Sequence, residues 1–384
     1  MRGENRFPQA AVKKELTSVS ENKEGNGLSR RKIGKKGFPQ LEIRRFFMKK
    51  TIITAIILLF ALSLAACTQT VQVFRTIRWE EGEELVYDIT KDSQGSYKYE
   101  EVDGAVKIPD NVVGTMTMTV NKAYKDDSGS VSETTVEIDV WNTYRVSALN
   151  GFDLTKIDSE YVRYDESDTE AVQLRTTLRY ETKFPLYSCA SVKVSGKGAV
   201  IVVYKSGNEV EFNDYTAVCE KFADKKATYS LTFNNGAHEN VENAVIDLGN
   251  TEFTDNTALM YIIRSLDLSA LKNAGSVSLV ASDIVAGAKR TVTVRTSAAS
   301  DSLRPKAVEN LLLESIGEEE KNKLTVVRVS GGNTLRGSYN YFYFDVSEDE
   351  AGKNVIHSSG KTVAKNRIVA MQQGYMVFML RGFR

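Results

Sequence analysis

The chain has little of the residues that carry most enzyme chemistry, with three cysteines and two histidines among its 384 residues. His238 and His357 each stand beside a turn, and no CxxC pair accompanies them, so the sequence offers no recognisable set of metal ligands. The HExxH and GxSxG motifs of zinc proteases and serine hydrolases are also missing. We therefore expect no metal, no cofactor and no catalytic residue of a standard triad.

Cysteine is scarce in the rest of the chain as well, because only Cys189 and Cys219 follow Cys67. In an oxidising compartment these two could form a disulfide, and closing the loop between them would stabilise the fold by roughly 3 to 4 kcal/mol. Two buried free thiols are the alternative, because the spacing of two cysteines in a sequence does not show whether their Cβ atoms meet.

Positive charge is also scarce once the first 66 residues are set aside. Fourteen of the 50 Lys and Arg but only five of the 50 Asp and Glu precede Cys67, so 36 cations and 45 acids follow it, a net charge of about −9. A dispersed acidic surface argues against a nucleic-acid partner and against electrostatic binding of a basic patch to anionic lipid. Attachment to a membrane would therefore depend on Cys67.

The stretch from Met48 to Cys67 has the order of an export signal. Two lysines follow Met48, an apolar run covers Ile52 to Leu64, and Leu64-Ala65-Ala66 precedes Cys67. This order resembles the bacterial lipoprotein signal, in which the cysteine receives diacylglycerol and becomes the mature N-terminus. The two acyl chains would supply stable anchoring. An uncleaved transmembrane anchor is the alternative, but the uncharged run is 16 residues long, short of the roughly 20 that span a bilayer.

The residues before this signal carry a strong positive charge and no apolar periodicity. Residues 1–47 hold 12 Lys or Arg and five Glu, which could form a basic arm, but a translation start at Met48 would make them a mis-assigned, disordered extension. The expected organisation is therefore an extension (1–47), a signal peptide (48–66), a lipid-anchored tether (67–78) and a β-rich extracytoplasmic domain (79–384).

From residue 79 onward the apolar residues follow a period of two. Met116, Met118 and Val120 alternate with threonines, as in a strand with one solvated face. The same alternation recurs in short segments separated by turn formers such as Asn234-Asn235-Gly236. We therefore predict a mainly β fold, an antiparallel curved sheet or half-barrel with one or two covering helices.

Two segments follow a helical period instead. Thr254 to Leu268 has Leu259, Ile262, Ile263 and Leu266 on one stripe, with Thr254 or Asp255 placed to cap the first turn. Asp301 to about Lys321 carries Pro305 in its first turn and a stripe made of Val308, Leu311, Leu312 and Ile316. Each segment is expected to cover the sheet rather than to bind a partner.

The strands near the end of the chain are apolar on both faces. In Tyr339 to Phe344 the aromatic residues alternate, so that Phe342 and Phe344 share one face while Tyr339, Tyr341 and Tyr343 share the other. We predict that the phenylalanine face is core and that the tyrosine face borders a ligand pocket, where a phenol could touch a ligand and still reach a polar partner. A strand packed against core on both sides is the alternative.

Three segments carry a resemblance to a known family. The stretch Gly82 to Asp88, the stretch Thr254 to Arg264 and the closing hairpin resemble a family of uncharacterised exported β-proteins that opens on a G-E-x-L-x-Y strand and contains a Y-x-x-R helix. That family is similar in architecture to the lipoprotein carriers LolA and LolB. The resemblance implies an antiparallel sheet curled into a half-barrel around helices, from which the Asp301 to Lys321 helix and the strands around Val192 to Tyr215 depart.

Two functions from different classes fit these features. The first is a non-enzymatic lipoprotein, held on the extracytoplasmic side of a membrane by Cys67, that binds an apolar or amphipathic ligand or a cell-envelope protein in its curled sheet. The second is a hydrolase that cleaves a cell-wall or surface polymer through paired carboxylates, whose pairing is spatial and invisible in a sequence. A two-lobed solute receptor fits less well, because it needs alternating βαβ units.

Overall fold

All residues described in the computed structural model fall within Phe60–Arg384. The expected extension (1–47), the signal peptide (48–66), Cys67 and Tyr339 lie outside the described residues. Those residues are 73, 79–90, 100–102, 105–107, 111–126, 129–149, 153–164, 168–185, 189–204, 207–249, 253–255, 258–331, 340–346, 355–358, 361–364, 367–373 and 376–383.

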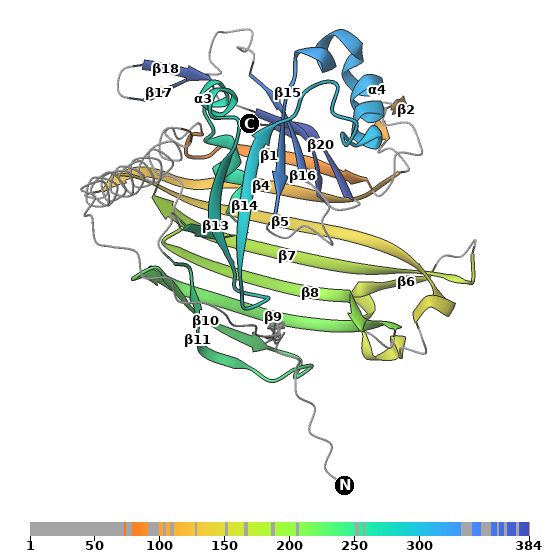
Figure 1. Ribbon diagram of the computed structural model, residues 1–384. Coiled ribbons are helices and arrows are strands. Elements are labelled where there is room, and N and C mark those ends of the chain that lie inside the picture. The colour runs from red at the N-terminus through yellow and green to blue at the C-terminus, as the bar shows by residue number, and fades with distance from the viewer. Residues whose placement is uncertain are drawn as a thin grey trace, which may run out of the picture. The chain divides into compact units, whose positions relative to one another are not determined.

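Most of the described residues lie in one 16-stranded sheet (Figure 1). Its strand order is β11-β10-β9-β8-β7-β5-β4-β1-β20-β19-β16-β15-β14-β13-β12, and β6 pairs with β7 beside this path. The two short hairpins β2–β3 and β17–β18 are separate. The strands are β1 (Glu84–Thr90), β2 (Glu100–Val102), β3 (Ala105–Lys107), β4 (Val112–Asp126), β5 (Gly129–Arg145), β6 (Val162–Tyr164), β7 (Ala171–Pro185), β8 (Ser191–Tyr204), β9 (Gly207–Ala223), β10 (Lys226–Phe233), β11 (Val241–Asp247), β12 (Phe253–Asp255), β13 (Val277–Asp283), β14 (Ala288–Thr296), β15 (Thr325–Ser330), β16 (Asn340–Asp345), β17 (Val355–Ser358), β18 (Lys361–Ala364), β19 (Arg367–Gln373) and β20 (Met376–Phe383).

The sheet confirms the predicted fold class. Every strand pair is antiparallel except β12 with β13, which run parallel. The strand β11, at one end of the sheet, contacts β14 near the other end. The two ends of the sheet therefore approach one another, which means that the sheet curves strongly. Within the described residues no ladder joins β11 to β12, and the curve stays unclosed.

The period of two separates the two faces of the sheet as the sequence predicts. On β4, Met116 and Met118 are buried in the main core, whereas Thr115 and Thr117 point to the opposite face. We refer to that opposite face, which points away from the core inside the curve, as the outer face. The strand β1 lies in the middle of the sheet, between β4 and the last strand β20.

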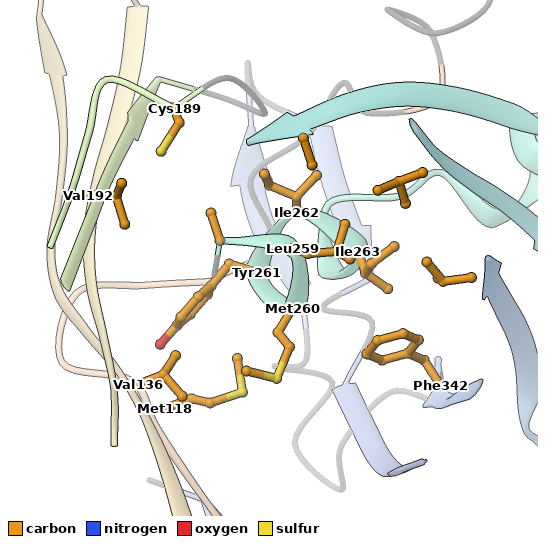
Figure 2. Packing of buried hydrophobic residues seen from close by; sticks show 14 of the residues in the cluster. Met118, Val136, Cys189, Val192, Leu259, Met260, Tyr261, Ile262, Ile263 and Phe342 are labelled. Atoms are coloured by element: carbon orange, nitrogen blue, oxygen red, sulfur yellow. The ribbon is translucent and has the colours of Figure 1, made fainter. Parts of the chain in front are cut away.

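A short helix fills the inside of the curve. All six residues of α2 (Leu259–Arg264) are buried, and each large apolar side chain buried there contributes roughly 1.5 to 3 kcal/mol. Figure 2 shows Tyr261 turned towards Met118 and Val136 on the β4 and β5 strands, and Ile263 turned towards Phe342 on β16. The helix therefore belongs to the core itself.

This helix is shorter than the one predicted over Thr254 to Leu268. Thr254 and Asp255 belong to β12, where they pair with Ala281 and Ser282, and the Asp255 carboxylate accepts a hydrogen bond from Ser282 Oγ. Strand pairing therefore overrides the local capping signal. A separate helix, α3 (Leu268–Ala274), follows after Asp267, whose carboxylate accepts from the Ala270 N–H and caps it.

The helix α4 (Lys306–Lys323) covers part of the outer face. Its residues Val308, Leu311 and Leu312 form a second apolar cluster with β15, β16, β19 and β20. Ile316, predicted to share their stripe, is 40% exposed. The next residue, Gly317, has a φ of 81°, which only glycine adopts readily, and the helix is kinked there. Across the part of the chain that the structure describes, no helix is long and apolar enough to cross a membrane.

Candidate functional site

The two motifs that carry the family resemblance meet at a buried ion pair. Glu83 Oε1 lies 2.6 Å from Arg264 Nη1, and the two side chains are 10% and 1% exposed. Burial alone would lower the pKa of Arg264, but the charge of Glu83 and its hydrogen bond outweigh burial and leave that pKa raised. Arg264 therefore stays charged inside the core, and the pair ties the start of β1 to α2.

Aromatic rings surround this ion pair. The Trp79 ring lies 5.6 Å from the Tyr261 ring in an edge-on arrangement, and the Arg264 guanidinium lies 5.7 Å from the Trp79 centroid. The Tyr87 hydroxyl donates to the Ile368 carbonyl over 2.9 Å. Together with α2, these side chains occupy the space inside the curve where the sequence predicted a bound ligand.

The tyrosine face of β16 lies beneath α4. Tyr341 and Tyr343 are buried in the second apolar cluster, whereas Phe342 and Phe344 are buried on the opposite side in the main core. The Tyr343 hydroxyl donates to Glu309 Oε1 on α4 over 3.0 Å. Burial and the charge of Glu309 raise the pKa of Tyr343, so the phenol stays protonated. Contact of these tyrosines with a ligand stays a prediction.

An open cleft begins beside this tyrosine face. It has a volume of about 710 Å³ and lies between α3, the loop 296–304 and β15. Val326, which lines the cleft, is the direct cross-strand partner of Tyr343. The apolar side chains that line it come from four separate segments of the chain: Leu268, Ala298, Leu324, Val326 and Val346.

Two cations, Lys272 and Arg304, also line the cleft, as does one carboxylate, Asp267, which caps α3. Arg304 is held in place, because its Nη2 donates to the Ser297 carbonyl over 2.5 Å and its Nη1 lies 3.5 Å from Glu309 Oε1. Below the loop, Asp301 pairs with Arg328, whose side chain is 5% exposed. The loop is therefore fastened to β15. An apolar wall bordered by a fixed guanidinium suits a molecule with an apolar body and an anionic head.

Sequence reasoning missed this cleft. Its lining comes from α3, the loop after β14, the start of β15 and the residue after β16, which are far apart in the chain. The one signal available was the Ser297 to Arg304 stretch, where short polar residues precede a helix and a cation stands next to Pro305. That pattern is common before helices and would not have singled out a site.

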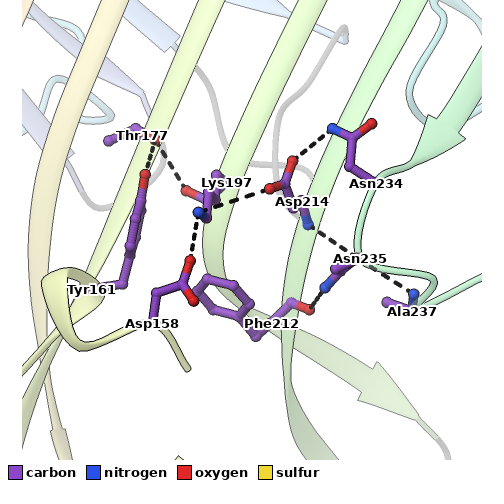
Figure 3. Close-up of polar contacts among 9 residues, drawn as sticks. All are labelled: Asp158, Tyr161, Thr177, Lys197, Phe212, Asp214, Asn234, Asn235 and Ala237. Atoms are coloured by element: carbon purple, nitrogen blue, oxygen red, sulfur yellow. Dashed lines mark hydrogen bonds and ion pairs between the residues drawn. The ribbon is translucent and has the colours of Figure 1, made fainter. Parts of the chain in front are cut away.

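A polar depression of about 430 Å³ lies on the outer face of β4, β5, β7, β8 and β9. At its centre Lys197 Nζ lies 2.6 Å from Asp158 Oδ2 and 3.9 Å from Asp214 Oδ2 (Figure 3). Asn234 Nδ2 donates to Asp214 Oδ1 over 2.7 Å. These contacts fix the polar groups relative to one another.

The carboxylates of this depression are all engaged by cations. Arg175 holds Asp139 through two hydrogen bonds of 2.9 and 2.7 Å. Arg179 pairs with Glu137, and Lys197 pairs with Asp214. A general acid in a hydrolase needs a carboxylic acid that keeps its proton near neutral pH. Each carboxylate that lines this depression lies instead in an ion pair with a neighbouring cation.

Cys189 and Cys219 are free and buried thiols in the structure. Burial raises the pKa of Cys189 well above its usual value, and burial raises the pKa of Cys219 to about 11. Because the thiolate is the reactive form, both thiols are expected to be inert at neutral pH.

Comparisons with known proteins give no functional assignment. No family model matches the chain, and no curated protein matches it. Among solved structures, the chain is similar to the crystal structure of a "Beta-barrel-like Protein of Domain of Unknown Function DUF1849 from Brucella abortus", with 12% identity and a TM-score of 0.36. That match covers 79% of this chain and 97% of the other.

Proposed function

We propose that the protein is an extracytoplasmic lipoprotein, attached to a membrane through Cys67, whose β domain is not an enzyme and binds an amphipathic anion. The binding site is the cleft between α3, the loop 296–304 and β15. The observation that carries the proposal is the composition of this cleft. Its volume of about 710 Å³ falls within the roughly 300 to 1,000 Å³ of small-molecule sites. Five apolar side chains and two cations line it, together with one carboxylate and four hydroxyl residues.

The two kinds of lining act on the two ends of such a ligand. Apolar area that a hydrocarbon chain buries against Leu268, Leu324 and Val326 contributes roughly 25 cal/mol per Å². The guanidinium of Arg304 would pair with a carboxylate or phosphate head group, and its contacts to Ser297 and Glu309 mean that little side-chain freedom is lost on binding.

Two further observations favour this site over the inside of the curve and over hydrolysis. The inside is packed with α2 and the Glu83–Arg264 pair. The carboxylates of the polar depression are paired with cations. A lipid anchor at Cys67 would also keep the domain close to a bilayer, which is a source of amphipathic anions.

The test is titration of the full chain with a dansylated fatty acid, followed by fluorescence. Ala298 is exposed and lines the cleft, so Ala298→Trp should fill the site and weaken binding at least tenfold. Ala237 is exposed in a distant turn, and Ala237→Trp is the matched control that should bind like the unaltered chain. Absence of saturable binding, or an Ala298→Trp variant with unchanged affinity, would contradict the proposal.

A second pair of measurements tests the anionic head. Arg304→Gln should weaken binding of the dansylated fatty acid by about tenfold, equivalent to about 1.4 kcal/mol. The same substitution should leave binding of the corresponding dansylated alcohol unchanged, because that probe carries no charge. Equal losses for both probes would mean that Arg304 supports the loop rather than the head group.

A further inference from the structure

The polar depression on the outer face continues into a second one. The second depression has a volume of about 590 Å³, and Arg179 lines both. The two linings follow consecutive rows of outward residues that run across β5, β7, β8 and β9: Glu137, Arg179, Ser195 and Thr216 form one row, and Thr135, Glu181, Lys193 and Val218 form the next. We refer to the two depressions together as the outer groove.

Charge in the outer groove is nearly balanced. Six carboxylates and four cations line it, and several of them pair with one another, within a strand or between neighbouring strands. Arg179 Nη2 lies 2.9 Å from Glu181 Oε1, Lys193 Nζ lies 3.7 Å from Glu181 Oε2, and Lys183 Nζ lies 3.8 Å from Glu133 Oε1. A nucleic acid or another polyanion needs an excess of positive charge, so the outer groove does not suit one.

Neutral hydrogen-bonding groups alternate with these charges. Each hydroxyl can both donate and accept, and the amides add paired donors and acceptors. Except for Asn234, which lies in the turn after β10, the residues that carry these groups stand on long paired strands, so the groups form a preorganised two-dimensional array. The neutral polar side chains in the lining include Thr115, Thr117, Asn121, Thr135, Thr177, Ser191, Ser195, Thr216 and Asn234.

The position of the outer groove argues against an extended peptide as its ligand. A peptide that adds to a sheet needs a free strand edge, but β5, β7 and β8 each pair on both sides. A peptide that lies across a sheet needs apolar pockets for alternate side chains, and the lining is mostly hydroxyl, amide and charged groups.

We infer that the outer groove binds a neutral polysaccharide. Such a chain presents many hydroxyls at regular spacing, carries no charge that requires a counter-charge, and is long enough to occupy both depressions at once. Carboxylates and guanidinium groups held by their ion pairs would accept from and donate to neighbouring hydroxyls of a sugar. This site is separate from the cleft beside α3, and its ligand belongs to a different chemical class.

The experiment is affinity electrophoresis of the full chain in gels that contain amylose, a mixed-linkage β-glucan or a soluble chitin derivative. Retardation in at least one gel is expected. Ser195 lies in the middle of the groove, and Ser195→Tyr should obstruct it and reduce retardation at least tenfold. Ser278→Tyr is the matched control, because Ser278 is exposed on β13 outside the groove, and it should migrate like the unaltered chain.

Thermal unfolding of both variants would show whether they keep the fold. A second variant, Thr177→Val, keeps the shape of Thr177 but removes its hydroxyl, and it should reduce retardation by several fold. The inference is overturned if none of the neutral polymers retards the chain, or if Ser195→Tyr is retarded as strongly as the control. If the groove bound peptides and none of the polysaccharides, it would be a protein-binding surface, and the inference would also be overturned.

Discussion

Glu83 on the segment before β1 and Arg264 at the end of α2 are joined at 2.6 Å, although 180 residues of chain separate them. The contact joins the segment that carries Gly82 to Tyr87 to the helix that carries Tyr261 to Arg264. Glu83 neutralises Arg264, while Tyr87 and Tyr261 from the same two motifs lie close enough to influence its charge. The two motifs are thus parts of one buried structural unit.

Removing one member of this pair should destabilise the domain strongly. Arg264→Met leaves the Glu83 carboxylate with a buried charge that has lost its partner, and we expect a loss of about 3 to 5 kcal/mol in the free energy of unfolding. The double variant Glu83→Gln with Arg264→Met should lose less than the single one. Arg145→Met is the control, because the Arg145 side chain is 60% exposed in its pair with Asp168. This variant should lose less than about 1 kcal/mol of the free energy of unfolding. Denaturant unfolding measures all three, and equal stability of the Arg264→Met and Arg145→Met variants would contradict the assignment.

The position of Tyr341 changes the expectation for its substitution. The sequence places Tyr341 on a ligand-bordering face, where truncation would leave folding nearly intact. Tyr341 is only 3% exposed beneath α4, so Tyr341→Ala should destabilise by about 3 to 5 kcal/mol, as should Phe344→Ala on the core face. Tyr164→Ala is the control, since that ring is 65% exposed. A Tyr341→Ala variant as stable as the Tyr164→Ala variant would show that α4 does not cover this face in solution.

Stability should fall at alkaline pH. Burial raises the pKa of Cys219 from 9.0 to about 11. Below about pH 9 the thiol is protonated in both the folded and the unfolded chain, so its contribution is constant there. Between about pH 9 and 11 the unfolded chain loses the proton first, which favours unfolding. From pH 8 to 10.5 we expect this thiol to remove about 1 to 2 kcal/mol. Cys219→Ala should reduce the measured fall by that amount, and an identical fall in both chains would refute the assignment.

The anchor prediction concerns Cys67, which lies outside the described residues. Only a thiol at this position can accept diacylglycerol, so Cys67→Ala should abolish lipid attachment and leave the protein unprocessed. Mass spectrometry of the N-terminal peptide, with partition into detergent, measures both effects. Cys189→Ala is the control and should be lipidated normally. A diacylglyceryl group on the Cys67→Ala protein would show that the assignment of the lipoprotein signal is wrong.

The sequence was most informative where a local pattern decides the structure. The alternation in Met116 to Val120 and the phenylalanine–tyrosine alternation in Tyr341 to Phe344 correctly separated the two faces of β4 and β16, because side chains in a strand must alternate. The stripe of Val308, Leu311 and Leu312 likewise located α4.

The sequence was least informative where distant segments decide the structure. Thr254 and Asp255 look like a helix cap, yet pairing with Ala281 and Ser282 extends them into a strand. No local pattern could show that Arg264 would find Glu83, or that Leu268, Ala298 and Val346 would line one cleft. Such relationships depend on the order of strands in the sheet, which turn signals and periodicity do not encode.

The place of β1 between β4 and β20 governs how the domain can be assembled. The Tyr87 hydroxyl donates to the Ile368 carbonyl, 281 positions later in the chain. The middle of the sheet is therefore held together by contacts between residues that lie very far apart in the sequence. Closing so large a loop is entropically costly, and folds dominated by such contacts form slowly. Until β20 has been synthesised, β1 and β19 each expose an unpaired edge in what will become the centre of the sheet, and exposed edges invite aggregation. Removal of the eight residues of β20 would therefore divide the sheet into two parts, instead of removing a strand from its edge.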